Sequence, residues 1–461
     1  MRLRLLALLG LVPVWCAALP GPADWVPMRW PWNQAQSLEL LTGTPVNCLL
    51  LKSYPENFVS AATGRGLVTL AVLTPSGDLL AAARRALAAK VTGLVLEGEF
   101  PEGAAASVRE AAGGAPVVEL TARNRLALGA KTAVLGTYQG VWPGISIDEN
   151  GAKKSGPTAS VWIDTNTGFL RAVRAWNDTV WIANEPPARM AVTGSRYLQV
   201  IADAAISGAR WVLAFEDDFA GRLAKHDAAA LSDWKRMAAL LGYFEGHPEW
   251  RHMQESGKLA VVQDPAKGGL LSGGILDMIA VKHTPVRPVA RQHLTPEALA
   301  GASMAVNVDA EGMTAEQKDV LRAFTRGGGT LLTGPPGWKD PTPAGDRITL
   351  EKAELERLND IWHDVNSMVG RRNMGVRLFN VSSMLSNYLE SADGKSAVLH
   401  LVNYSDYPVE NVAVHYLGSF RHATLITPDG AEKKLEVYET DEGLGVDLDK
   451  VSVCATVRLE Q

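Results

Sequence analysis

Short apolar runs that alternate with helix-forming stretches over residues 38–257 constrain the fold of this chain most. Helical segments rich in Ala and Leu, such as 78–90 and 195–209, separate the runs. Nearly continuous apolar strands are typical of a parallel sheet that is covered on both faces. Strands that alternate with helices at this spacing form βα units, and seven such units favour a (β/α)8-like, TIM-type barrel, regular or irregular, over an open sheet. The seven runs are 45–51, 66–73, 91–100, 115–120, 131–138, 179–184 and 209–215.

A second α/β pattern begins at residue 258. The run 258–264 predicts a strand, and Thr314 is placed to cap a helix that the glycines from Gly327 onward would end. We expect a flavodoxin-like α/β domain that begins at residue 258. A helical bridge over 349–394 follows it and is counted with it, so the domain ends at residue 394. Its other expected strands are 285–290, 303–310 and 329–335.

The tail of the chain changes pattern again. Residues 395–461 alternate apolar and polar side chains in short segments that are separated by Pro, Gly and Asp turns. This is typical of a small antiparallel β-sandwich. The barrel therefore spans 19–257, and the predicted fold class is α/β with an added all-β module.

The first residues have the features of a secretory leader. Arg2 and Arg4 precede an apolar run, and Cys16-Ala17-Ala18 offers a small-residue cleavage site. We expect residues 1–18 to be a signal peptide and the protein to be secreted or periplasmic; the alternative is an uncleaved or membrane-anchored leader. The apolar run is too short to cross a bilayer, and no later stretch is suited to do so, so no membrane span is expected in the mature chain.

Charge and cysteine content exclude several classes of function. The chain has 45 Lys and Arg against 50 Asp and Glu, without a basic patch, so nucleic acid is not an expected partner. Cys48 and Cys454 are the cysteines left after the leader, either paired or, as we favour, separate buried thiols. The nine His show no metal-ligand spacing, and residues 334–340 lack the ending of a phosphate-binding loop. No metal or cofactor is therefore expected.

Acidic residues follow two of the expected barrel strands. Asn184-Glu185-Pro186 ends the run 179–184, by our count the sixth strand, and Glu216-Asp217-Asp218 follows the next run. Chemistry in such barrels is located at the carboxyl ends of the strands. Two carboxyl groups ~5–5.5 Å apart allow retaining hydrolysis of a glycosidic bond, and ~6.5–9.5 Å allows inverting hydrolysis. Glu185 is thus a candidate acid, with Glu216 or Asp217 as base or nucleophile. Alternatively, Glu185 begins a solvated loop and the 216–218 cluster caps a helix.

Other polar and aromatic residues at expected strand ends are candidates for binding a sugar. Amides and carboxylates can bind hydroxyl groups, and aromatic rings can pack on the C–H face of a sugar ring. The alternatives are core packing for the tryptophans and helix capping for the pair at 164 and 166. The candidate substrate-binding residues are Tyr138, Trp142, Asp164, Asn166 and Asn184.

The order of the three domains resembles that of family-42 β-galactosidases and related glycosyl hydrolases. The best local matches are 258–264 and 329–335 in the middle domain and 399–405 in the sandwich. In that family the middle domain is a trimerisation module with an amidotransferase-like fold. The resemblance implies that Glu185 is the acid/base and that a carboxylate on a later strand is the nucleophile. No cysteine lies between 49 and 453, which excludes amidotransferase chemistry here. The resemblance also implies a possible homo-oligomer formed through the middle domain.

Two functions are therefore expected from the sequence. The first is a secreted glycoside hydrolase that acts on an oligo- or polysaccharide through a carboxylate pair at the barrel strand ends. The second is a catalytically degenerate barrel that binds carbohydrate or serves in assembly. The position of Glu185, toward a shared pocket or toward bulk solvent, discriminates between the two.

Overall fold

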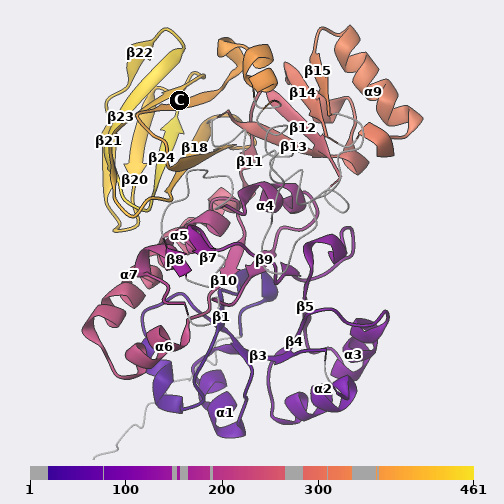
Figure 1. Cartoon of the computed structure of the whole chain (residues 1–461), viewed down its shortest axis with the longest axis vertical. Coiled ribbons are helices and arrows are strands. Elements are labelled where there is room, and N and C mark those ends of the chain that lie inside the picture. Colours follow the sequence, from indigo (N-terminus) through magenta and orange to yellow (C-terminus); the bar gives the residue numbers. More distant parts are fainter. Residues whose placement is uncertain are drawn as a thin grey trace, which may run out of the picture.

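The computed structural model describes residues 19–75, 77–147, 153–155, 165–186, 190–264, 284–308, 310–334, 360 and 363–461. Three bodies are visible in Figure 1: a barrel in the lower half, a parallel sheet at the upper right and antiparallel sheets at the upper left. The predicted fold class is confirmed. The leader expected at residues 1–18 lies outside the described residues.

Eight of the described strands form a parallel sheet that closes on itself. Its last strand bonds to its first, since the amide of Arg29 donates to the carbonyl of Leu213 at 2.8 Å. The order follows the chain and leaves out the hairpin of β7 (Ile145–Ile147) and β8 (Lys153–Ser155). The barrel strands are β1 (Pro27–Arg29), β2 (Cys48–Leu51), β3 (Val68–Leu73), β4 (Gly93–Glu97), β5 (Val117–Thr121), β6 (Leu135–Thr137), β9 (Val180–Ala183) and β10 (Arg210–Val212).

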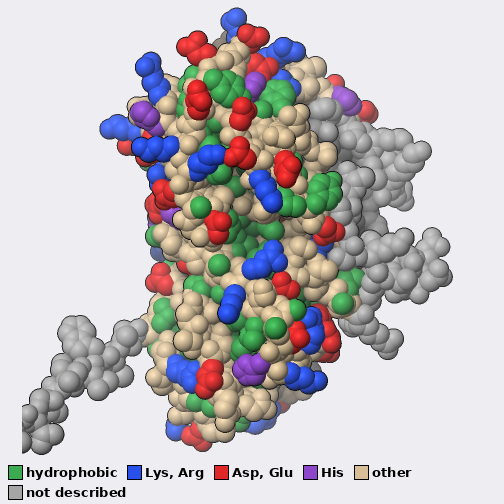
Figure 2. Space-filling model, turned by 90° about the vertical axis from the view of Figure 1, so that its left-hand side faces the viewer, with side chains coloured by type: hydrophobic (Ala, Val, Ile, Leu, Met, Phe, Trp, Pro, Cys, Tyr) green, Lys and Arg blue, Asp and Glu red, His purple; other side chains and the backbone are tan. Residues whose placement is uncertain are grey.

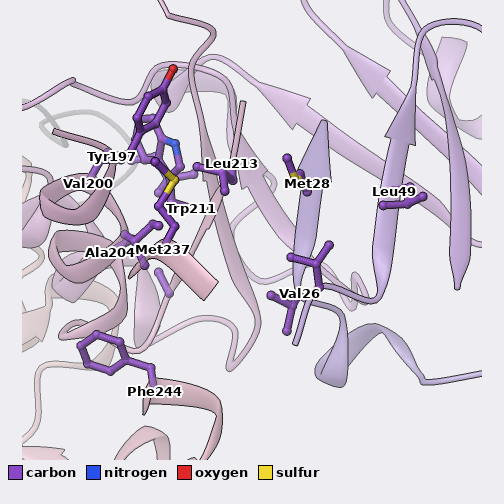
Figure 3. Packing of buried hydrophobic residues seen from close by; sticks show 14 of the residues in the cluster. Val26, Met28, Leu49, Tyr197, Val200, Ala204, Trp211, Leu213, Met237 and Phe244 are labelled. Atoms are coloured by element: carbon purple, nitrogen blue, oxygen red, sulfur yellow. The ribbon is translucent and has the colours of Figure 1, made fainter. Parts of the chain in front are cut away.

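Strand β1 corrects the sequence-based count. Its three residues start with a proline and were not recognised as a strand, so β9, which precedes Asn184, is the seventh described barrel strand and not the sixth. Side chains on the outer surface of β1, β2 and β10, among them Met28, Leu49 and Trp211, pack toward the covering helices (Figure 3). The helices of the barrel are α1 (Glu56–Gly64), α2 (Leu79–Ala88), α3 (Ala104–Ala112), α4 (Thr167–Arg174), α5 (Gly194–Ala205), α6 (Asp217–Ala224) and α7 (Ala228–Glu245).

The middle domain is an open parallel sheet with the order β13-β12-β14-β15. Helix α9 (Ala315–Arg326) begins as predicted, because the side chains of Thr314 and Gln317 form a reciprocal capping box, and it ends at Gly327. The strands are β12 (Leu259–Gln263), β13 (Val286–Ala290), β14 (Met304–Asn307) and β15 (Thr330–Thr333).

The C-terminal module is a β-sandwich that starts earlier than the expected boundary at residue 395. Strands β16 (Val376–Phe379) and β17 (Met384–Glu390), which lie within the expected helical bridge, pair into its two sheets. In the described residues, one sheet has the order β11-β17-β18-β24-β20-β21 and the other β16-β19-β23-β22. The remaining strands are β11 (Gln254–Glu255), β18 (Ser396–Asn403), β19 (Val409–Tyr416), β20 (His422–Ile426), β21 (Glu432–Leu435), β22 (Tyr438–Thr440), β23 (Gly443–Val451) and β24 (Cys454–Glu460).

Surface and thiol features agree with the sequence. Figure 2 shows Lys and Arg interspersed with Asp and Glu, and no extended basic area on the face drawn. Cys48 and Cys454 are both buried and free, so they are separate thiols. None of the helices in the described ranges combines the length and the apolarity needed to cross a bilayer.

Candidate active site

The barrel interior is apolar for most of its height. Because side chains alternate between the two faces of a strand, the inner cluster identifies which residues point inward. The same alternation, continued one or two residues past β2, β6 and β9, places five side chains inward at the carboxyl ends: Arg29, Lys52, Glu97, Tyr138 and Glu185. The inner cluster contains Cys48, Leu50, Val68, Leu70, Val72, Val95, Val118, Leu120, Val134, Trp181, Ala183 and Val212. A charged layer therefore closes an apolar barrel at the end where such barrels carry their chemistry.

Arg29 connects two carboxylates in this layer. Its guanidinium group donates to both oxygens of Glu97, at 2.7 Å from Nη1 and 2.5 Å from Nη2. The same Nη1 atom lies 3.5 Å from an oxygen of Glu185. Nη1 contacts both carboxylates. The closest oxygens of Glu97 and Glu185 are therefore separated by no more than the sum of their distances from Nη1. Two carboxylates that share one guanidinium group in this way are close enough to act on a single glycosidic bond.

Glu185 is held by two cations. The ammonium group of Lys52 lies 2.5 Å from the same Glu185 oxygen that faces Arg29. Partial burial acts to raise the pKa of Glu185, but the hydrogen bond from Lys52 and the positive charges of Arg29 and Lys52 outweigh it, so the pKa lies below its usual value. A carboxyl group with a lowered pKa is ionised at neutral pH. This favours a nucleophile or a charge-stabilising carboxylate over the proton donor that the sequence predicted.

A second polar group borders the charged layer. The hydroxyl of Tyr138 donates to Glu99 at 3.0 Å, and Arg125 lies 2.6 Å from the other oxygen of Glu99. Burial and the neighbouring carboxylate raise the pKa of Tyr138 to about 12. Tyr138 is therefore a neutral hydroxyl at the rim, in a position where it can serve the sugar-binding role predicted for it.

The carboxylates after β10 have a structural contact. Glu216 caps α6, and its two oxygens accept the backbone amides of Asp218 at 2.7 Å and Phe219 at 2.8 Å. Asp217 is exposed in the first turn of the same helix. The capping alternative thus describes Glu216, whereas the catalytic role predicted for Glu216 and Asp217 has no contact among the described residues that supports it.

The predicted sugar-binding residues have different surroundings. Asn166 is buried and accepts from Arg123 and from the amide of Val141, so its polar atoms are committed to the protein. Trp142 is 5 % exposed and packs edge-on against Tyr197 and Trp211. The packing of Trp142 agrees with the core-packing alternative, whereas Asn166 occupies the N-cap position of α4 without a capping hydrogen bond from its side chain.

Asn184 and Asp164 are the other two residues predicted to bind a sugar. Asn184 is partly exposed beside Glu185 and donates to the carbonyl of Gly140 at 2.7 Å. Asp164 lies outside the described residues.

The sequence did not reveal Arg29 and Lys52. Arg29 ends a three-residue strand, and Lys52 directly follows the run CLLL, whose alternation places residues 48, 50 and 52 on one face. That alternation is the signal in the sequence for Lys52, because a cation at a strand end can bind a carboxylate or a ligand just as acidic, amide and aromatic side chains can bind a sugar.

Comparisons with known proteins agree on the fold. No protein-family model and no curated protein matches the sequence. The structure is similar to α-L-fucosidase isoenzyme 2 from Paenibacillus thiaminolyticus at a TM-score of 0.64 and 10% identity, covering 95% of this chain and 98% of that chain. It is also similar to a rhamnosidase from Novosphingobium sp. PP1Y, at a TM-score of 0.45 and 12% identity over 78% of this chain and 38% of that one.

A third similar structure is Gan42B, a GH42 β-galactosidase from G. stearothermophilus, at a TM-score of 0.42 and 10% identity over 88% of this chain and 66% of that chain. At 10% identity, the similarity to the fucosidase shows a shared fold.

Proposed function

We propose that the protein is a glycoside hydrolase whose carboxylate pair is Glu97 and Glu185, joined by Arg29. The observation that carries this proposal is the position of one guanidinium group between two carboxylates from β4 and the end of β9, at the carboxyl end of the barrel. In this proposal the pair acts with retention of configuration, with Glu185 as the nucleophile. The similarity to a fucosidase of nearly equal extent supports a saccharide as the substrate.

In this mechanism Glu185 is the ionised group. Its lowered pKa suits attack on, or stabilisation of, a developing positive charge at the sugar carbon. Glu97, which is less exposed, takes the role of proton donor and later of base. Because Arg29 donates to both oxygens of Glu97, one of these oxygens can carry and deliver a proton only after Arg29 moves that hydrogen bond to another acceptor when the substrate binds.

Kinetics on a panel of aryl glycosides test this proposal. We expect Glu185→Gln and Glu97→Gln to lower kcat/KM by a factor of about 100 or more, as loss of a catalytic group does. Azide should restore turnover to Glu185→Ala by replacing the missing nucleophile. The matched control is Glu119→Gln, because Glu119 lies on the outer face of β5, where it pairs with Arg109 of α3, and its loss should leave kcat/KM unchanged.

A catalytically degenerate, carbohydrate-binding barrel is the second candidate. It is favoured by the fact that Glu97, Glu99 and Glu185 are each ion-paired in the described structure. Absence of turnover by the wild type on the whole panel, together with measurable saccharide binding that Glu185→Gln abolishes, would select this candidate over the enzyme.

Secretion and self-association remain proposals. N-terminal sequencing of the mature protein tests cleavage after residue 18. Light scattering of the purified chain tests for a homo-oligomer formed through the middle domain. Neither outcome affects the assignment of the rim residues.

A further inference from the structure

The four-stranded sheet of the sandwich presents aromatic side chains on its outer face. Val376, Leu378, Val414 and Val446 of this sheet point into the sandwich core, so the residues between them point outward. The cross-strand register aligns four outward residues in a row across β16, β19, β23 and β22: Arg377, His415, Gly445 and Tyr438. Phe379 is the next outward residue of β16 after Arg377.

The rings in and beside this row form one continuous surface. The ring centroid of His415 lies 4.5 Å from that of Phe379 and 6.3 Å from that of Tyr438. Gly445 allows the Tyr438 ring to lie this close to β23, because a Cβ atom at position 445 would lie 2.5 Å from Cε2 of Tyr438. The Tyr438 ring therefore packs directly against the backbone of β23, and all three rings remain partly exposed.

Polar groups with free hydrogen-bonding capacity lie beside the rings. Arg377 contacts one oxygen of Glu442 at 3.2 Å. The other Glu442 oxygen and Nδ1 of His415 are buried and 3.8 Å apart, and neither has a hydrogen-bond partner within the described part of the chain. These side chains line a hollow of about 10 Å³. That volume admits one water-sized group, such as a single hydroxyl.

We propose that this outer face of the sandwich is a second saccharide-binding surface, in which Phe379, His415 and Tyr438 contact sugar rings and the hollow at Glu442 receives one hydroxyl group. A small movement of either side chain opens these two buried atoms to a hydroxyl group, which can donate to the carboxylate oxygen and accept from the imidazole at once. Aromatic rings with a few placed polar groups are typical of ligand sites. The surface is separate from the barrel rim and does not depend on catalysis there.

Affinity electrophoresis of the full chain in gels that contain soluble xylan, galactan or mixed-linkage β-glucan tests the surface. We expect at least one polysaccharide to retard the wild type. Tyr438→Ala and Phe379→Ala should each weaken binding by about tenfold, as loss of a ring contact does. Tyr438→Phe, which keeps the ring, should stay within about threefold of the wild type.

Two controls separate this surface from other sites. Tyr407→Ala removes a tyrosine that is 64% exposed elsewhere in the sandwich and should leave the retardation unchanged, whereas Glu185→Gln, which changes the barrel rim, measures the part of the retardation that the rim contributes. The proposal is overturned if none of the three polysaccharides retards the wild type. It is also overturned if retardation survives Tyr438→Ala and is lost in Glu185→Gln, which would assign saccharide binding to the rim alone.

Discussion

Tyr404 of the sandwich donates a hydrogen bond of 2.5 Å to Asp203 of barrel helix α5. Asp203 is fully buried and also accepts from Thr165 and Asn166 at the start of α4. Asn166 in turn binds Arg123, which follows β5. One buried carboxylate therefore joins the sandwich to the loops beside the barrel rim, so the two domains act as one folded unit.

This contact predicts a measurable loss of stability. Tyr404→Phe removes one donor from a carboxylate that is not exposed to water, and we expect the free energy of unfolding to fall by about 1–3 kcal/mol. Urea denaturation measures the difference. Tyr407→Phe, which removes the hydroxyl of an exposed tyrosine, is the matched control and should change stability by less than about 0.5 kcal/mol. Equal stability of both variants would contradict the role given to Tyr404.

The Arg29–Glu97 pair should be more important for stability than the pairs on the outer surface. Glu97→Gln leaves the nearly buried guanidinium of Arg29 without its bidentate partner, and we expect a loss of about 3 kcal/mol in urea denaturation. Glu119→Gln breaks a partly exposed pair and should cost at most about 1 kcal/mol. If the two substitutions have the same cost, Arg29 is not held by Glu97 in solution.

Lys52 should control the ionisation of Glu185. Lys52→Met removes a hydrogen bond and a charge that lower the pKa of Glu185, while the effect of burial persists, so we expect the pKa of this carboxyl group to rise. Carbon-detected NMR of 13C-labelled glutamate measures the titration directly. Lys90→Met, which breaks the distant surface pair with Glu56, is the control and should leave the Glu185 titration where it is. An unchanged Glu185 pKa in Lys52→Met would remove Lys52 from the site.

A buried histidine should make the protein sensitive to acid. Burial lowers the pKa of His400 to about 3, far below the ~6.5 of an unfolded chain. The unfolded state therefore binds more protons between these two values, and stability falls as the pH decreases from about 6.5 toward 3. This one group contributes up to about 1.4 kcal/mol per pH unit in that window.

The contribution of His400 can be isolated by substitution. His400→Gln retains a group that can bond with Thr456 but does not titrate. We expect the difference in unfolding free energy between wild type and variant to change between pH 7 and pH 5 by about 1–2 kcal/mol. Parallel pH profiles for the two proteins would contradict a neutral, buried His400.

Strong local patterns could be predicted from the sequence, whereas short or ambiguous ones could not. The helix start at Thr314 and the other seven barrel strands follow from local spacing in the sequence. Strand β1 has three residues and gives no periodic signal. Strand β17, MLSNYLE, is rich in residues that also form helices, so its place in the sheet depends on its pairing with β18 and with β11, which lies more than a hundred positions earlier in the chain.

The candidate site was predictable in part for the same reason. The position of Glu185 at a strand end follows from the sequence next to it. Its pairing with Arg29 and Lys52 depends on closure of the barrel, which brings together residues that are more than a hundred positions apart. The capping role of Glu216 was recognised as an alternative, because an acidic residue before a helical run is typical of an N-terminus.

Covalent trapping tests the central assignment most directly. A 2-deoxy-2-fluoro glycoside with a dinitrophenyl leaving group, of the sugar that the aryl-glycoside panel selects, slows both steps and accumulates the glycosyl-enzyme of a retaining hydrolase. We predict that peptide mapping by mass spectrometry finds the sugar on Glu185. A sugar attached to a different carboxylate, or wild-type protein that turns over substrate and remains unlabelled, would contradict the assignment.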